Sequence, residues 1–326
     1  MKQNELFDGL EFIPKDEGSL DAAPFWYWIN ERHRIYLKKE AGETNLTDDP
    51  ILQEYRFCNV FRELDRVTKW IRQNWREPYK NHENLWFAMA IARQINWPAT
   101  LDEIGFPDGN MWELRENAER AIQLMSNILD VRKSRGDKVY TGAYMIRAES
   151  DTNKPWYSWT KQQYMAKIVL GRVFEAQDKF YNMWNCGDEF KLGLAQPTLQ
   201  EVHQWFMQFH GWGEFMSYEV VTDLRHTRYL ENAPDIMTWA NAGPGAKRGL
   251  NRLFNRPLDA PMSQKLANEE MKYLLKLSQR PGNLEEHVPA LEMRDIEHSL
   301  CETDKYLRVL NGEGRPRAKY VHGRGY

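Results

Sequence analysis

The sequence predicts a mainly α-helical protein of two lobes with at most one short β element. Apolar side chains recur at spacings of three and four residues over most of the chain, which is the repeat of an amphipathic helix. Turn residues such as Pro98 and Gly136 separate these runs at short intervals, as in packed helical lobes. With 326 residues, of which 42% are hydrophobic, the chain can form a substantial core or two lobes that share an interface.

The first predicted helix begins near Thr47, which can cap it, and Pro50, which suits a first helical turn. It should run to about Trp75, because apolar residues recur at helical spacing throughout this range. Two further helices are predicted over residues 82–96 and 111–135 on the same grounds.

The segment 138–147 is rich in β-prone residues, and we predict it to be a short strand or an extended connector. Helical spacing then resumes and predicts helices over residues 159–182, 198–210, 214–225, 246–254, 263–279 and 293–310. The expected domains are an N-terminal extension, a helical catalytic region with a hairpin at 198–225, and a basic tail, over residues 1–45, 46–314 and 315–326.

Composition excludes several classes of protein. No run approaches the roughly 18 apolar residues of a membrane span, and the polar start lacks the apolar region of a signal peptide, so we expect a cytoplasmic protein. The three cysteines are far apart in sequence and predict buried thiols rather than disulfides or a zinc site. The net charge of −3 gives no general argument for a nucleic-acid partner.

A glycine-containing turn joins the two helices of the hairpin at 198–225. Its glycines can adopt positive φ and leave backbone amides accessible to an anion such as a DNA phosphate. Hairpins of this kind contact the DNA backbone without reading its sequence. We therefore predict DNA contacts at Gly211, Trp212 and Gly213, with simple helix packing as the alternative.

An acidic residue follows this hairpin. Asp223 lies near the position at which helix-hairpin-helix base-excision enzymes hold a catalytic aspartate, although it comes sooner after the turn. Glu219, one helical turn earlier, could serve instead. The alternative for Asp223 is a cap or a salt bridge with Arg225 or Arg228.

A second turn, with Gly243 and Gly245, leads into another predicted helix. It is not a P-loop, because the spacing before the lysine and a following Ser or Thr are missing. Its free amides, together with Lys247 and Arg248, suit a backbone phosphate or a pyrophosphate group. The alternative is a sharp corner between helices with two solvated bases.

Charged residues alternate with large apolar ones in the segment 56–66, so some of them should lie near a core or cleft. If the segment is helical, Asn59, Arg62 and Asp65 share one face. An internal salt-bridge network and a cleft for a carboxylate or phosphate both fit. The substrate-binding candidates are Arg56, Asn59, Arg62, Asp65, Tyr144, Lys247 and Arg248.

The last predicted helix carries Glu297, His298 and Glu302, which could act as acids or bases. His298 has no second histidine at ligand spacing, so the sequence contains no metal signature. Beyond this helix, basic residues form a tail that could lie on DNA phosphates or simply be solvated: Arg315, Arg317 and Lys319.

Several of these segments, in this order, resemble the α-glutamyl/putrescinyl thymine pyrophosphorylase family. The resemblance covers roughly residues 45 to 320 and rests on Arg56-Phe57-Cys58-Asn59-Val60-Phe61-Arg62 with Asp65, Thr141-Gly142-Ala143-Tyr144, Gly211-Trp212-Gly213 with Phe215 to Leu224, Gly243-Pro244-Gly245 to Leu250, and Glu297-His298-Ser299-Leu300-Cys301-Glu302 with Asp304-Lys305-Tyr306. The family is related to the helical domain of 5-hydroxymethyl-deoxyuridine DNA kinases and belongs to the helix-hairpin-helix DNA glycosylase-like superfamily.

The resemblance implies a bacteriophage enzyme of DNA hypermodification, located in the host cytoplasm. Its partners would be double-stranded DNA with a modified thymine and a free amino acid of the glycine or glutamate class, and no membrane. The amino acid would replace the pyrophosphate of pyrophosphorylated 5-hydroxymethyluracil, with no certain cofactor and a divalent metal possible. A kinase step is not expected from a chain without a P-loop.

The implied roles follow from this substitution. Lys247 and Arg248 would hold pyrophosphate, Arg56 or Arg62 the amino-acid carboxylate, and Asp223 would act as the base. Trp212 or Tyr144 could stack on DNA if the target base is flipped. Two other functions remain open at this point: a DNA glycosylase that uses Asp223, and a non-catalytic module that binds modified DNA.

Overall fold

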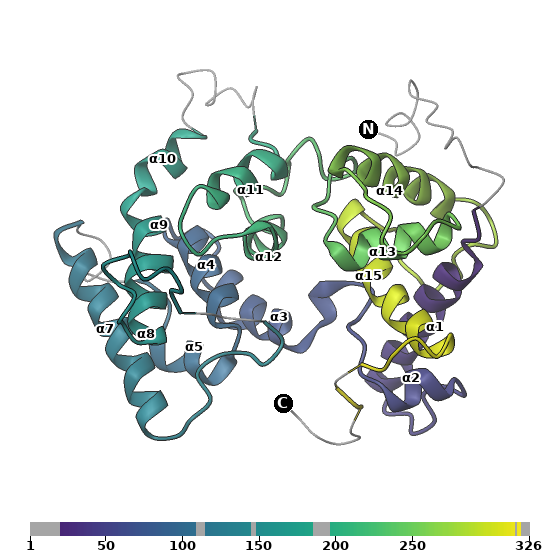
Figure 1. Cartoon of the computed structure of the whole chain (residues 1–326), viewed down its shortest axis with the longest axis horizontal. Helices are drawn as coiled ribbons and strands as arrows, with labels where there is room; N and C mark the ends of the chain where they lie inside the picture. The colour runs from purple at the N-terminus through teal and green to yellow at the C-terminus, as the bar shows by residue number, and fades with distance from the viewer. Residues whose placement is uncertain (1–19, 109–114, 145–147, 185–195, 317, 321–326) are drawn as a thin grey trace. The chain divides into compact units, whose positions relative to one another are not determined.

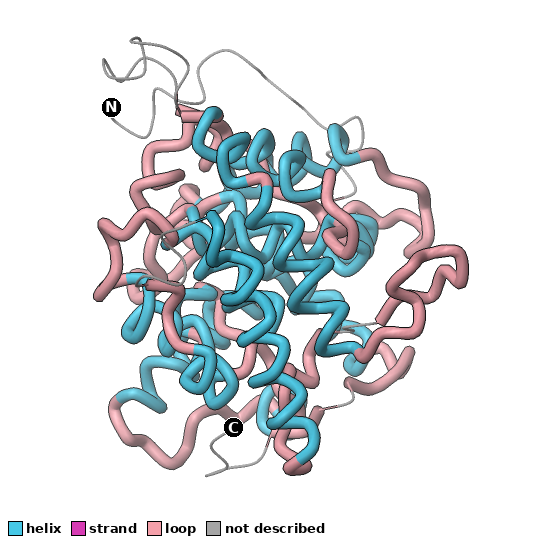
Figure 2. The backbone as a smooth tube through the Cα atoms, turned by 90° about the vertical axis from the view of Figure 1, so that its left-hand side faces the viewer, coloured by secondary structure: helices cyan, strands magenta, loops and turns pink. Residues whose placement is uncertain are grey.

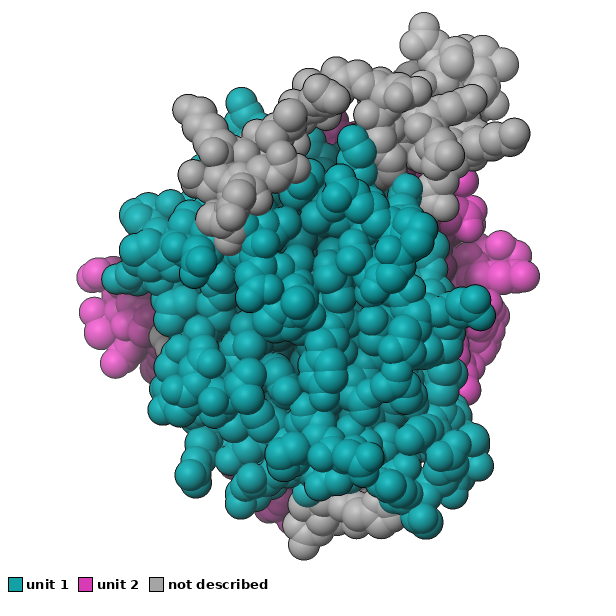
Figure 3. All heavy atoms as spheres, turned by 90° about the vertical axis from the view of Figure 1, so that its right-hand side faces the viewer, with its two compact units in different colours: residues 1–65, 236–326 teal, residues 66–235 magenta. Residues whose placement is uncertain are grey.

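The structure is a computed structural model that describes residues 20–108, 115–144, 148–184, 196–316 and 318–320. Its contacts divide the chain into two compact units: residues 1–65 with 236–326, here unit 1, and residues 66–235, here unit 2 (Figures 1 and 3). Within the described ranges the backbone is helix and loop, with only isolated β-bridges (Figure 2). The predicted mainly α, two-lobed organisation is confirmed.

Unit 1 is organised around its last helix, α15 (Met293–Leu310), which contacts each of the other described α-helices of this unit (Figure 1). These are α1 (Ala23–Glu40), α2 (Pro50–Glu54), α13 (Pro244–Leu253) and α14 (Gln264–Ser278). One face of α15 is apolar and buried, with Ile296, Leu300 and Leu307 along it. A helix with such a stripe is stabilised mainly by packing, so α15 forms the core on which the unit is built.

Glycines set the distance between α13 and α15. A side chain at Gly245 would collide with the Sγ atom of Cys301, and a Cβ atom at Gly249 would lie 2.5 Å from the carbonyl oxygen of Leu300. Neither glycine has a positive φ, so the requirement is for space rather than for backbone conformation. The glycines of this segment therefore allow two helices to pack closely.

Replacing Gly249 with Ala is expected to lower the free energy of unfolding by about 1–3 kcal/mol, because the new methyl group meets backbone atoms that cannot move aside. Urea unfolding measures the change. The matched control is Gly142→Ala, where the added Cβ would meet only the end of the Lys138 side chain, 3.9 Å away. Equal stability of the two variants would contradict a steric role for Gly249 in the α13–α15 contact.

Unit 2 contains a helix that is buried along its whole length, α4 (Leu85–Ile95). Around it lie α3 (Arg66–Ile71), α5 (Pro98–Ile104), α7 (Arg115–Ser134), α8 (Lys161–Gln163), α9 (Gly171–Glu175), α10 (Gln177–Asn182), α11 (Leu199–Met207) and α12 (Glu214–Leu224), together with the π-helical segments Arg72–Arg76 and Tyr164–Leu170. A helix that is almost entirely apolar belongs in a core, which explains the burial of α4.

The predicted single helix over residues 47–75 is wrong. The helix α2 begins after Asp49, whose carboxylate accepts hydrogen bonds from the amides of Ile51 and Leu52. It ends at Glu54, because residues 54–56 pair with residues 318–320. The predicted cap Thr47 instead donates a hydrogen bond to Glu31. Tertiary pairing here overrides local helical spacing.

Two further differences concern the start of the chain and the predicted strand. Helix α1 was not predicted, although its aromatic side chains Phe25 and Trp28 are fully buried. Residues 138–144 form no strand, because their backbone groups make hydrogen bonds to other parts of the unit. The amide of Thr141 donates to the carbonyl of Ile95, and Arg132 donates to the carbonyl of Lys138. Residues 145–147 lie outside the described part. The predicted helix over residues 159–182 is divided into α8, the π-helical segment Tyr164–Leu170, α9 and α10, and the start predicted at residue 111 lies outside the described part. The remaining predicted helices end close to the observed ends, and the predicted domain boundaries stay predictions.

Candidate functional site

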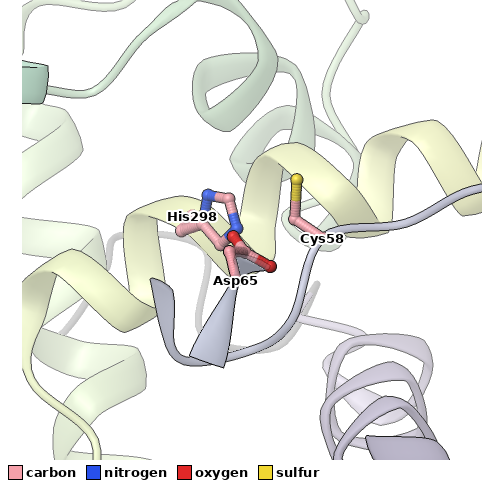
Figure 4. A group of neighbouring side chains, drawn as sticks. All are labelled: Cys58, Asp65 and His298. Carbon is pink, nitrogen blue, oxygen red and sulfur yellow. The ribbon is translucent and has the colours of Figure 1, made fainter. Parts of the chain in front are cut away.

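Two segments far apart in sequence meet in unit 1. The loop of residues 55–65 brings Cys58 and Asp65 to His298 on α15, and the ligand atoms of the three side chains all lie within 4.8 Å of one another (Figure 4). Cys58 is exposed, whereas Asp65 and His298 are partly buried. We call these three residues the Cys58 cluster. Sequence analysis singled out both segments but did not predict that they meet.

Hydrogen bonds fix the shape of the loop. The backbone amide and the Nδ2 atom of Asn59 both donate to Oδ1 of Asp65, each at 3.0 Å, and Nδ2 also donates to the carbonyl of Leu64. Arg62 begins a single 3₁₀ turn that ends at Leu64. The prediction that Asn59, Arg62 and Asp65 share a helix face is therefore wrong, because the chain is not α-helical here. Asn59 and Asp65 nevertheless interact directly.

Charged side chains surround the Cys58 cluster. Glu302 of α15 accepts a hydrogen bond from the backbone amide of Cys58 at 2.9 Å and pairs with Lys305 at 2.5 Å. Burial by itself would raise the pKa of Glu302, but Lys305, His298 and the Cys58 amide hold that pKa below its ordinary value. The carboxylate of Glu302 is thus ionised at neutral pH.

Arg32 approaches the loop from α1, where its Nε donates to the carbonyl of Cys58 at 3.0 Å. The Cys58 residue has exposed surface, yet burial of its thiol, followed by the charges of Glu302 and Asp65, raises the thiol pKa well above its ordinary value. Lys305 and Arg62 act in the opposite direction. Cys58 is therefore a neutral thiol at pH 7 unless a cation stabilises its thiolate.

The predicted base Asp223 lies elsewhere, in the core of unit 2. It is 1% exposed and forms a two-pronged ion pair with Arg93 of α4, with Nε–Oδ2 and Nη2–Oδ1 distances of 2.5 and 2.6 Å. Arg93 is 2% exposed and also donates to Thr68 at 2.9 Å. The sequence alternative for Asp223 was a salt bridge with Arg225 or Arg228. Asp223 does form a salt bridge, but its partner is Arg93, 130 residues away in sequence. The available signal was Arg93, the one charged residue in a helix whose other residues, except Gln94, are apolar.

Two other predicted residues do meet in unit 2. The hydroxyl of Tyr144 donates a hydrogen bond to Oε2 of the buried Glu219 at 2.5 Å. The ring of Tyr144 packs edge-on against the exposed Phe215, with centroids 5.0 Å apart. The substrate role of Tyr144 and the catalytic role of Glu219 stay predictions.

The hairpin consists of α11 and α12 joined by the predicted turn. Gly211 has φ +83° and a Cβ atom there would lie 2.6 Å from a methyl group of Val169, so the turn needs glycine for both reasons. Trp212 is buried, and its Nε1 donates to the carbonyl of Val169 at 2.7 Å. Gly213 precedes α12 at the surface. DNA contacts at this turn stay predictions, but the indole of Trp212 belongs to the core and is not placed for base stacking.

The second glycine turn already faces carboxylates of α15. The amide of Gly243 donates to Glu297 at 3.3 Å, and Nε of Arg248 lies 3.3 Å from Asp304. Lys247 lies on the first turn of α13 and is partly exposed. Pyrophosphate binding by Lys247 and Arg248 stays a prediction, although an anion here would have to compete with these carboxylates.

The described part of the basic tail contacts residues at the start of the 55–65 loop. Lys319 pairs with Glu54 at 3.0 Å, and the backbone amide of Arg56 donates to the carbonyl of Ala318. Arg315 is exposed and lines a pocket of about 330 Å³ with residues of α2, a pocket that contains no member of the Cys58 cluster. Arg317 lies outside the described residues.

Comparison with known proteins shows the family of this chain. A family model described as the helical domain of 5-hmdU DNA kinase matches residues 21–315, a range that includes both segments of the Cys58 cluster. The 5-hmdU DNA kinase of Bacillus phage SP10 is 25% identical over 313 residues, which cover 88% of this chain and 45% of the phage protein. The chain thus spans about half the length of that relative. No solved structure matches, and no described helix is long and apolar enough to cross a membrane.

Proposed function

The chain belongs to the family of the helical domain of 5-hmdU DNA kinases, and we propose that it is a transferase that modifies thymine-derived bases in DNA. Its substrates are double-stranded DNA with pyrophosphorylated 5-hydroxymethyluracil and a free amino acid of the glycine or glutamate class. The amine nitrogen forms a bond to the exocyclic methylene carbon while the bond from that carbon to oxygen breaks. Pyrophosphate leaves with the electron pair, and the amine releases a proton to solvent.

The observation that carries this proposal is the meeting of the 55–65 loop with α15 at the Cys58 cluster. A departing pyrophosphate gains negative charge as the bond to carbon breaks, so the site needs fixed positive groups around it. Lys305 and Arg32 are held beside the Cys58 cluster by Glu302 and by a backbone carbonyl. His298 can add a further N–H donor. These groups could stabilise pyrophosphate as it leaves.

The remaining predicted residues fit supporting roles. Asp223, buried and paired with Arg93, holds α12 against α4 rather than serving as the base. This role disfavours a glycosylase that depends on Asp223, because its carboxylate is neither exposed nor unpaired. Gly211 and Gly213 stay candidates for DNA contacts, and Arg56 or Arg62 stays the candidate for binding the amino-acid carboxylate.

Incubation of the chain with duplex DNA containing pyrophosphorylated 5-hydroxymethyluracil and a mixture of amino acids tests the function. Mass spectrometry of the digested nucleosides is expected to show one new thymidine derivative that carries an amino acid. Duplex DNA with unmodified 5-hydroxymethyluracil is the control and should give no product, since it lacks the leaving group. Free base with abasic DNA would indicate a glycosylase, and unchanged DNA with every amino acid would contradict the proposal.

A further inference from the structure

We propose that Cys58, Asp65 and His298 bind one divalent metal ion of the zinc class. The three side chains offer a sulfur, an oxygen and a nitrogen atom, which together are the ligand types of zinc sites in proteins. The inference concerns binding of the metal and does not depend on the reaction proposed above.

The spacing of the ligand atoms suits this ion. In a tetrahedral site with bonds of about 2.0–2.3 Å, neighbouring ligand atoms lie roughly 3.3–3.7 Å apart. Each pair of ligand atoms in the Cys58 cluster lies within 4.8 Å, so shifts of about 1 Å or less by the side chains would close the site. Figure 4 shows Asp65 beside the imidazole of His298, with Cys58 on the same loop as Asp65.

The surroundings orient two of the three ligands. Asn59 donates two hydrogen bonds to Oδ1 of Asp65, and Glu302 binds the backbone amide of Cys58. Such outer interactions fix ligand geometry and are a regular part of metal sites in proteins. The nearby cation Lys305 is paired with Glu302, and Arg32 donates to the backbone carbonyl of Cys58 rather than to its sulfur atom.

Three protein ligands leave one position of a tetrahedral zinc ion open, which is the arrangement of catalytic rather than structural zinc sites. Water or a phosphate oxygen would occupy it. If the proposed function is correct, that oxygen belongs to the pyrophosphate of the DNA substrate, and the metal adds to the positive charge around the leaving group.

Cobalt(II) provides a direct test with the full chain, because a thiolate bound to cobalt absorbs in the near ultraviolet. Protein stripped with a chelator and titrated with Co²⁺ is expected to develop this absorption with one ion per chain, and Zn²⁺ should displace it. Cys58→Ser should remove the absorption, and Asp65→Asn should weaken Co²⁺ binding at least about tenfold. Circular dichroism of each variant confirms that it is folded.

The matched control is Cys301→Ser. It changes a different thiol, which lies on α15 and is not part of the Cys58 cluster. It should leave the absorption intact. Absence of stoichiometric Co²⁺ binding by the unchanged protein, or an absorption that survives Cys58→Ser, would overturn the metal site. Neither result bears on transfer of an amino acid to DNA, which the nucleoside assay measures separately.

Discussion

Asp223→Ala is expected to destabilise unit 2 by about 3–5 kcal/mol, because it leaves the guanidinium of Arg93 buried without its carboxylate. Both side chains are almost fully enclosed, so water cannot replace the lost partner. Urea unfolding followed by circular dichroism measures the loss. The predicted result is a protein that unfolds at much lower urea concentration.

The control is the exposed ion pair of Arg172 and Glu175 on α9, 3.5 Å apart. Glu175→Ala should change stability by less than about 1 kcal/mol, since solvent screens exposed pairs. The double variant Arg93→Met with Asp223→Leu should recover part of the loss, because no buried charge remains. An Asp223→Ala protein of normal stability that has lost turnover would instead support the catalytic role predicted from the sequence.

His298→Ala and Asp65→Asn are each expected to lower amino-acid transfer by about 10²–10³-fold, because each removes a ligand of the proposed metal ion that would stabilise the leaving pyrophosphate. Binding of the modified duplex, measured by fluorescence anisotropy, should change little. Initial rates from nucleoside mass spectrometry measure the effect on transfer.

Lys247→Ala is the informative comparison for these variants. This variant removes a lysine ammonium group at the start of α13, outside the Cys58 cluster, which the sequence predicts to hold pyrophosphate. We expect a small change in rate for Lys247→Ala. If Lys247→Ala abolished transfer while His298→Ala and Asp65→Asn stayed active, pyrophosphate would lie at the second glycine turn, and our placement of the site would be wrong.

The helices of the fold are largely predictable from the sequence, but the elements that create the Cys58 cluster are not. Helical spacing of apolar residues predicts α15 with its correct ends at Met293 and Leu310. The same spacing continues through residues 55–61, but residues 54–56 pair with residues 318–320 and the chain continues as a loop. Local pattern carries no information on such long-range pairing.

The candidate site is predictable in its parts and not in its assembly. Charged residues among apolar ones at 56–66, and Glu297, His298 and Glu302 on α15, stand out in the amino-acid sequence by themselves. Their meeting joins residues 244 apart in sequence, as in the bond from Cys58 to Glu302. The sequence has no second histidine at ligand spacing, and a ligand set drawn from two distant segments, such as the one proposed here, has no spacing that a sequence pattern could reveal.

Acidic and glycine residues are harder to interpret. Asp223 looks catalytic from its place after a hairpin, and only its contact with Arg93 distinguishes a buried ion pair from a base. Gly243 and Gly245 suggest an anion site from the sequence, and a Cβ atom at Gly245 or Gly249 would collide with Cys301 or Leu300, which shows an additional requirement for close packing of helices. In both cases the structural role depends on a neighbour from another helix, which the local sequence does not identify.

The central claim is that an amino acid displaces pyrophosphate from a base in DNA. Its most direct test is to measure pyrophosphate release and amino-acid adduct in the same reaction, with purified chain, pyrophosphorylated 5-hydroxymethyluracil DNA and the amino acid that gives a product. We predict equal amounts of the two products at every time point, with both lost together in Asp65→Asn. Pyrophosphate release without an adduct, or DNA that remains unchanged, would contradict the claim.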